Sequence, residues 1–210
     1  MPSGNPEHLT LSIEGGDSVT ALAYSAKEPR LDMTLVLAHG AGAGQTHPFI
    51  VGFARSLAVL GIDVATFNFP YMEHRRKTPD PGPVLEVCYR SVVEALKESE
   101  RLGTGAMFAG GKSMGGRIAS QMAARWPDLA LRGLIFVGYP LHPPGRPDRL
   151  RDAHLPRVRQ PMCYVQGTRD TFGTPQELEP ILQHLPKATL FTVADGDHSL
   201  TVPTRSALSQ

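Results

Sequence analysis

Short apolar stretches alternate with helix-like stretches between residues 31 and 194, and this alternation constrains the fold more than any other feature of the sequence. Continuous apolar runs of strand length lie at 31–38, 62–67, 107–110, 133–137, 162–166 and 189–194. Segments with apolar residues at helical spacing lie between them, at 48–60, 83–102, 114–126 and 174–185. Before them, two alternating segments at 9–13 and 19–24 flank Gly15 and Gly16 and predict a β-hairpin. The pattern predicts an α/β fold with a mostly parallel central sheet and helices on both faces.

Length and charge narrow the classes of protein to which the chain could belong. With 210 residues we expect a single domain over 1–210, and a net charge of +1 argues against a nucleic-acid-binding protein. No apolar run reaches the roughly 20 residues of a membrane span, and the first residues do not resemble a secretory signal. We therefore expect a cytoplasmic protein with no membrane contact, in which Cys88 and Cys163 are reduced thiols.

The segment after the third predicted strand of the parallel series carries a G-x-S-x-G motif. Gly111 and Gly115 stand two residues either side of Ser113, directly after the apolar run 107–110 and directly before a predicted helix. This strand-turn-helix context is typical of a nucleophile elbow, in which a strained turn raises the serine hydroxyl above the sheet. The same turn places the Met114 amide at a helix N-terminus, where it can donate to an oxyanion.

A phosphate-binding loop is the competing interpretation of the same residues. Gly111, Lys112 and Ser113 match the end of G-x-x-x-x-G-K-[ST], but the first glycine would have to stand at position 106, which is alanine. The intervening residues also have strand character, which does not suit a loop around phosphates. We therefore disfavour nucleotide binding. Beside a nucleophilic serine, Lys112 either holds the loop in place or tunes the site, and the sequence leaves both roles open.

A nucleophilic serine needs a base and an acid that orients the base. Asp170 follows the strand at 162–166, and His198 follows the last strand, which gives the chain order serine, acid, histidine of α/β-hydrolases. The alternatives are a turn aspartate and an ordinary loop histidine. Asp195 and Asp197 are weaker acid candidates, since neighbours in sequence rarely orient an imidazole, and we interpret them as turn residues. We predict Ser113 as nucleophile, Asp170 as acid and His198 as base.

A second oxyanion donor is expected from the loop after the strand at 31–38. The glycine-rich run 39–44 allows the backbone to approach a substrate closely. We assign the Ala41 amide as the partner of the Met114 amide, with Gly42 as the alternative. His39 has no second histidine or cysteine at ligand spacing, so we expect it to brace the loop. The site is predicted to use no metal and no organic cofactor.

Several segments together resemble the small dienelactone-hydrolase-like α/β-hydrolases, and more narrowly the group related to the KANL and testis-expressed proteins. The segments are HGAGAG (39–44), TPDPGP (78–83), GGKSMGGR (110–117), YPLHPPGRPDRLRDAHL (139–155), GTRD (167–170) and DGDHS (195–199). The resemblance implies the α/β-hydrolase fold, with Ser113, Asp170 and His198 as nucleophile, acid and base. Most members of the group are known only as expected hydrolases, and some eukaryotic relatives act as subunits of complexes.

Two functions follow as hypotheses. The first is a serine hydrolase of esters or thioesters of small acyl groups, whose partner is a small-molecule ester. The second is a non-catalytic scaffold of the same fold that serves as a complex subunit.

One departure from the resemblance concerns the end of the chain. Hydrolases of this fold usually finish with a helix after the histidine loop, whereas only 12 residues follow His198 and they show no amphipathic pattern. Either that helix is absent or the chain is truncated. If it is absent, a partner chain could cover the sheet, and we expect a homodimer. Light scattering that detects only monomer at micromolar concentration would count against this hypothesis.

Overall fold

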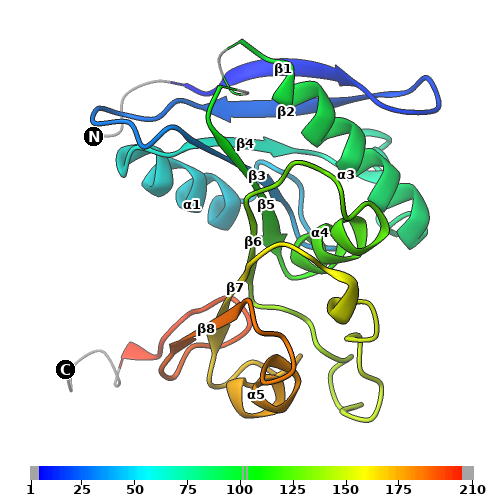
Figure 1. Ribbon diagram of the computed structural model, residues 1–210, viewed down its shortest axis with the longest axis vertical. Coiled ribbons are helices and arrows are strands. Elements are labelled where there is room, and N and C mark those ends of the chain that lie inside the picture. The colour runs from blue at the N-terminus through cyan, green and yellow to red at the C-terminus, as the bar shows by residue number, and fades with distance from the viewer. Residues whose placement is uncertain (1–4, 101, 103, 205–210) are drawn as a thin grey trace.

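The computed structural model describes residues 5–100, 102 and 104–204, and its centre is a twisted sheet of eight strands (Figure 1). The strands are β1 (Glu7–Ser12), β2 (Ser18–Tyr24), β3 (Met33–Ala38), β4 (Asp63–Phe67), β5 (Ala106–Lys112), β6 (Gly133–Val137), β7 (Met162–Gly167) and β8 (Ala188–Val193). Their order in the sheet is β1-β2-β4-β3-β5-β6-β7-β8. β3 to β8 run parallel, while β2 is antiparallel to both β1 and β4. The predicted hairpin and mostly parallel sheet are confirmed.

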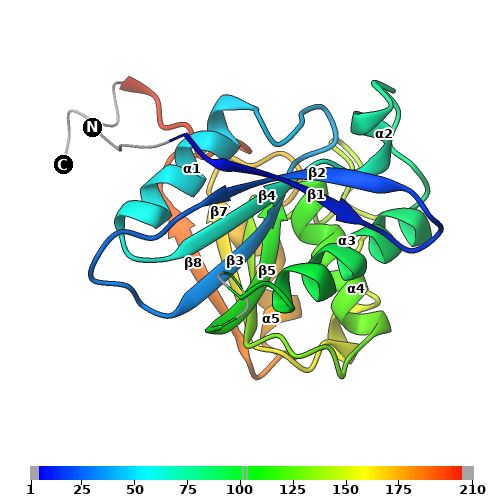
Figure 2. The ribbon, with the colours of Figure 1, turned by 90° about the horizontal axis from the view of Figure 1, so that it is seen from above.

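Helices cover both faces of the sheet, as the alternating pattern predicted. They are α1 (Pro48–Val59), α2 (Pro70–Glu73), α3 (Gly82–Lys97), α4 (Met114–Arg125), the 3₁₀ turn η1 (Leu155–Arg157) and α5 (Pro175–Leu182). Figure 2 shows α1 on one side of the sheet and α3 and α4 on the other. The buried apolar residues accordingly form two clusters, one under α1 and a larger one under α3, α4 and α5. Within the described residues, no helix is long and apolar enough to cross a membrane.

The largest differences from the predicted elements are two helix ends and one additional helix. The helix expected over 83–102 ends at Lys97, and the chain then turns so that Leu102 is buried outside the helix, with its carbonyl accepting a hydrogen bond from Thr34 Oγ1 (2.7 Å). The helix expected over 174–185 ends at Leu182, and α2 lies in a segment predicted as loop. The apolar spacing identified the buried positions of α3 but not those of α1, whose buried residues are Ile50, Ala54 and Ala58 while Leu60 is 66% exposed. Nor does a buried apolar residue require a helix at its position. The segment that bears on a closing helix includes residues 205–210, which lie outside the described part of the chain.

Tyr89 fastens α3 to the middle of the sheet. Its fully buried hydroxyl accepts a hydrogen bond from the Gly110 amide (2.8 Å) and lies 2.7 Å from the Val36 carbonyl and 2.5 Å from the Gly110 carbonyl. Val36 belongs to β3 and Gly110 to β5, so one side chain joins a helix to two neighbouring strands. Both strands lead directly into the loops that carry candidate functional residues.

Replacement of this tyrosine tests the importance of that contact. We expect Tyr89→Phe to lower the free energy of unfolding by about 1–3 kcal/mol, because it removes hydrogen bonds to buried backbone groups. Urea unfolding measures the change. Tyr164→Phe is the matched control, since the described residues offer its buried hydroxyl only the Met162 sulfur, at 3.7 Å. Equal losses in the two variants would contradict the special role of Tyr89.

Candidate active site

Ser113, Asp170 and His198 meet at one edge of the sheet. They follow the C-terminal ends of β5, β7 and β8, and these strands are parallel, so their ends reach the same edge. His198 Nε2 lies 2.8 Å from Ser113 Oγ, and His198 Nδ1 lies 2.9 and 2.8 Å from the two carboxylate oxygens of Asp170. A carboxylate beside Nδ1 assigns the proton to that nitrogen, which leaves the Nε2 lone pair facing the serine hydroxyl. This arrangement has the geometry of a serine-histidine-aspartate triad.

Ser113 occupies the strained turn that the G-x-S-x-G motif predicted. Its backbone has φ +52° and ψ −117°, a conformation that costs a non-glycine residue about 1–3 kcal/mol. The turn packs so closely that a Cβ on Gly115 would lie 2.4 Å from the Ala38 carbonyl oxygen. The Ser113 amide donates to the Val137 carbonyl (3.0 Å) and the Ser113 carbonyl accepts from the Arg117 amide (3.1 Å). Neighbouring strands and the first helical turn thus hold the strained conformation.

Two donors orient the carboxylate of Asp170, which is 1% exposed. The side-chain amide of Gln166 donates to Oδ2 (2.9 Å) and the Phe172 amide donates to Oδ1 (2.8 Å). Because both oxygens are held, the plane of the carboxylate is fixed where it faces the His198 imidazole. Asp170 therefore makes the contact expected of the orienting acid.

Phe172 is a site residue that the sequence interpretation missed. Its ring stacks on the His198 imidazole, with ring centroids 4.2 Å apart and an angle of 30° between planes. The stack limits rotation of the imidazole about its side-chain bonds. The sequence signal that could have identified it is its position, because Phe172 is an aromatic residue two positions after the predicted acid Asp170.

Asp195 and Asp197 shape the histidine loop and do not face the imidazole nitrogens. Asp195 has φ +55°, and its amide donates to Thr168 Oγ1 (2.8 Å). The Asp197 carboxylate accepts from the amides of Ser199 (2.8 Å) and Thr201 (2.9 Å), and the bond from Thr201 is the main cause that lowers its pKa. Their interpretation as turn residues agrees with these contacts.

The two amides predicted as oxyanion donors belong to the first residue of α4 and to the loop after β3. Met114 is the first residue of α4, and the loop with Ala41 passes the serine turn so closely that a Cβ on Gly40 would lie 3.7 Å from Ser113 Cβ. Within the described part of the chain, the amides of Ala41 and Met114 donate no hydrogen bond. The Gly42 amide donates none there either, so it stays the alternative.

His39 and Tyr71 fix the peptide planes of the loop after β3, which contains Ala41. His39 Nδ1 lies 2.8 Å from the Gly40 carbonyl, which shares a peptide unit with the Ala41 amide. The Tyr71 hydroxyl donates to the Ala41 carbonyl (2.9 Å). In a trans peptide the N–H points opposite to the C=O, so a carbonyl that is held on one side directs its amide to the other. The contact of His39 with the Gly40 carbonyl agrees with the bracing role expected for this residue.

The bracing histidine must be neutral. His39 Nε2 accepts a hydrogen bond from the Phe69 amide (3.2 Å), which requires a lone pair, while Nδ1 carries the proton. Burial lowers the pKa of His39 from 6.5 to about 4. A protonated ring would lose the bond from Phe69 and place a charge in the interior.

His39 should therefore make the native state sensitive to acid. Between pH 6.5 and 4 the unfolded chain binds a proton at this residue and the native chain does not, so stability falls as the pH falls, by up to about 3 kcal/mol. Urea unfolding of the wild type and of His39→Gln, at pH 7 and pH 4.5, measures this contribution. We expect the wild type to lose more stability than the variant between the two pH values. A variant that loses as much as the wild type would contradict the assignment.

The described residues contain no group of three or more histidine, cysteine, aspartate or glutamate side chains arranged to hold a metal ion. The phosphate-loop interpretation does not agree with the structure, because residues 106–112 form β5 and leave no loop there to surround phosphates.

The strand order and the position of the serine turn define the α/β-hydrolase fold. The chain belongs to the alpha/beta hydrolase domain family, whose pattern it matches over residues 31–210. The fold includes the N-terminal antiparallel hairpin described above.

Solved structures support the same fold. XC6422 from Xanthomonas campestris, described as an α/β serine hydrolase without lid, has a TM-score of 0.74 at 23% identity and covers 94% of this chain and 88% of its own. The dienelactone hydrolase from Anabaena variabilis has a TM-score of 0.74 at 18% identity, over 98% and 94% of the two chains. Est1E from Butyrivibrio proteoclasticus has a TM-score of 0.72 at 13% identity, over 92% and 90%. Hydrolases and esterases are thus its structural neighbours.

Proposed function

We propose that this protein is a serine hydrolase that cleaves carboxylic esters or thioesters of small acyl groups through an acyl-enzyme intermediate. The observation that carries the proposal is the continuous hydrogen-bonded series from Ser113 Oγ through the His198 imidazole to the Asp170 carboxylate. Within the family, the segments quoted above favour the group related to the KANL and testis-expressed proteins.

In the first half of the reaction, the serine becomes acylated. His198 Nε2 takes the hydroxyl proton while Ser113 Oγ forms a bond to the acyl carbon. The carbonyl oxygen gains negative charge, and the amides of Met114 and Ala41 stabilise it, at about 3 kcal/mol for each donor. The bond from the acyl carbon to the leaving oxygen or sulfur then breaks, and His198 returns its proton to the leaving group.

In the second half, water releases the acyl group. His198 takes a proton from water while the water oxygen attacks the acyl carbon, and the bond to Ser113 Oγ breaks as the serine regains its proton. Asp170 keeps the proton on Nδ1 throughout, so that Nε2 serves as base and as acid in turn. The products are a free carboxylic acid and the alcohol or thiol.

The preference for small acyl groups rests on the connections at the site. The segment between β6 and β7, residues 138–161, contains only the 3₁₀ turn η1 and forms no separate lid domain. One structural neighbour is itself described as lacking a lid. A panel of p-nitrophenyl esters of increasing chain length measures the preference, with the fastest turnover expected for the short chains.

Removal of the nucleophile is the central test. We expect Ser113→Ala to lose roughly 10⁶ in turnover of p-nitrophenyl acetate, because triad members act as a unit. A fluorophosphonate probe should label the wild type at Ser113 and leave the variant unlabelled, with circular dichroism confirming that both are folded. Hydrolysis retained by the variant would contradict the mechanism, and a folded wild type that resists labelling would favour the scaffold.

Replacement of the acid tests the role of the carboxylate. Asp170→Asn should lower kcat by about 10⁴, because an amide at this position favours the wrong imidazole tautomer. Asp195→Asn is the matched control, since Asp195 is a turn residue in which asparagine tolerates the positive φ. A comparable loss of kcat in both variants would contradict the assignment of Asp170 as the orienting acid.

A further inference from the structure

Lys112 is a buried lysine that the triad mechanism does not use. It is the last residue of β5, directly before Ser113, and it is 9% exposed. Its ammonium donates a hydrogen bond to the backbone carbonyl of His198. No ion pair between Lys112 and a carboxylate occurs in the described part of the chain, so this backbone carbonyl is its hydrogen-bond partner there.

Gly138 and the Phe49 ring lie beside the Lys112 ammonium. A Cβ on Gly138 would lie 3.0 Å from Lys112 Nζ, 2.8 Å from the His198 carbonyl oxygen and 3.5 Å from Asp170 Oδ2. A side chain at this position would therefore crowd both the ammonium and the carbonyl, and Gly138 also has φ +62°. The Phe49 ring closes another side, with its centroid 5.9 Å from Nζ.

The contact joins two parts of the site that the sheet does not join directly. Ser113 follows β5 and His198 follows β8, and β6 and β7 lie between these two strands. The loop after β8, which contains His198, is also hydrogen-bonded to the loop after β7. The Arg169 amide donates to the Gly196 carbonyl (2.9 Å), and the Asp195 amide donates to Thr168 Oγ1 (2.8 Å). Lys112 thus spans directly from the strand of the nucleophile to the backbone of the base.

Charges near the ammonium keep it protonated at neutral pH despite its burial. Desolvation lowers the pKa of Lys112 from 10.5 to about 8, and the charges of Asp170 and Asp197 act in the opposite direction. The lysine therefore remains a charged donor to the His198 carbonyl under ordinary conditions.

We propose that Lys112 is a positioning residue, whose bond to the His198 carbonyl sets the distance between the imidazole and Ser113. This inference rests on the hydrolase function proposed above. Lys112 acts through His198 and makes no contact with the reacting atoms. A displacement of about 1 Å in a catalytic group can lower a rate by about 10²-fold, which is the size of effect that such a contact can control.

Three variants test this role. Lys112→Met keeps the length of the side chain and removes the donor, while Lys112→Arg keeps a charged donor. Lys187→Met is the matched control. Lys187 also donates to a backbone carbonyl, that of Arg159 (3.0 Å), but it precedes β8 and so lies at the N-terminal end of that strand, whereas His198 follows its C-terminal end. We expect Lys112→Met to lower kcat for p-nitrophenyl acetate by roughly 10²-fold with little change in KM. Lys112→Arg should recover most of kcat, and Lys187→Met should leave it unchanged.

A second readout does not depend on turnover. In protein labelled with ¹⁵N-histidine, the proton on His198 Nδ1, shared with Asp170, should give a low-field NMR resonance in the wild type. Lys112→Met should shift or broaden this resonance, and Lys187→Met should not. If Lys112→Met does not fold, Lys112→Gln, whose shorter side chain carries no charge, provides the same comparison.

The outcomes separate the two proposals. Loss of kcat and a changed resonance in Lys112→Met alone support the positioning role. An unchanged kcat and resonance in a folded Lys112→Met, or equal losses in Lys187→Met, would overturn it. A wild type without esterase activity whose resonance still changes only in Lys112→Met would refute the hydrolase function and leave the contact between Lys112 and His198 established.

Discussion

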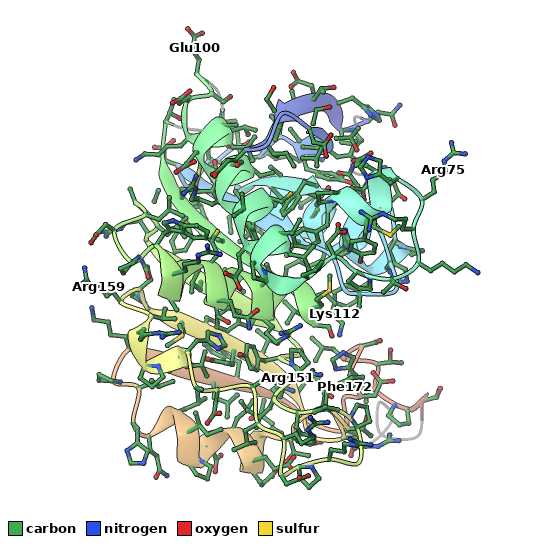
Figure 3. All side chains as sticks on the ribbon, turned by 90° about the vertical axis from the view of Figure 1, so that its right-hand side faces the viewer. Arg75, Glu100, Lys112, Arg151, Arg159 and Phe172 are labelled. Atoms are coloured by element: carbon green, nitrogen blue, oxygen red, sulfur yellow. The ribbon has the colours of Figure 1, made fainter. Side chains whose placement is uncertain are left out.

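The placement of one imidazole ring is the constraint on which the rest of this site depends. His198 must face Ser113 with one nitrogen and Asp170 with the other, at 2.8 Å on each side. It follows β8, which stands at the end of the sheet and pairs with β7. Strand pairing therefore supports the histidine loop from one side only, and side-chain contacts hold the imidazole in place from the other directions. The carboxylate of Asp170 and the ring of Phe172 contact His198 from the loop after β7, and the ammonium of Lys112 contacts its backbone carbonyl from the end of β5. Figure 3 shows Lys112 and Phe172 on the same side of the molecule.

The nucleophile is held in a different way. Ser113 follows β5, which pairs with β3 on one side and β6 on the other, and its strained backbone is bonded to Val137 and to the first turn of α4. A strained residue persists only where its surroundings over-determine it, and the middle of a sheet provides such surroundings. The loop after β3, which contains Ala41, benefits from the same support, because Tyr89 joins β3 and β5 through hydrogen bonds. The site thus combines a rigid nucleophile with a base whose position needs additional contacts.

Local patterns explain how much of this arrangement could be predicted from the sequence. Ser113, Asp170 and His198 each follow an apolar run of strand length, and parallel strands bring their C-terminal ends to one edge. The prediction of where they lie needed no long-range information beyond that rule. Helix ends were less predictable, since Leu102 is an apolar residue close after α3 but is buried as part of a turn. Apolar periodicity indicates burial, and several backbone conformations can bury the same side chain.

The contact of Lys112 with the histidine backbone could not be predicted from the sequence. The lysine and the His198 carbonyl are 86 positions apart, and no motif pairs the residue before the nucleophile with the backbone of the base. Burial of an ammonium is costly, and an apolar side chain of similar volume at the end of β5 would be expected to stabilise the fold more. The contact is consequently hard to explain by stability. A positioning role explains the contact. Lys112 directly precedes Ser113, so its hydrogen bond to the His198 backbone fixes the position of the histidine relative to the serine.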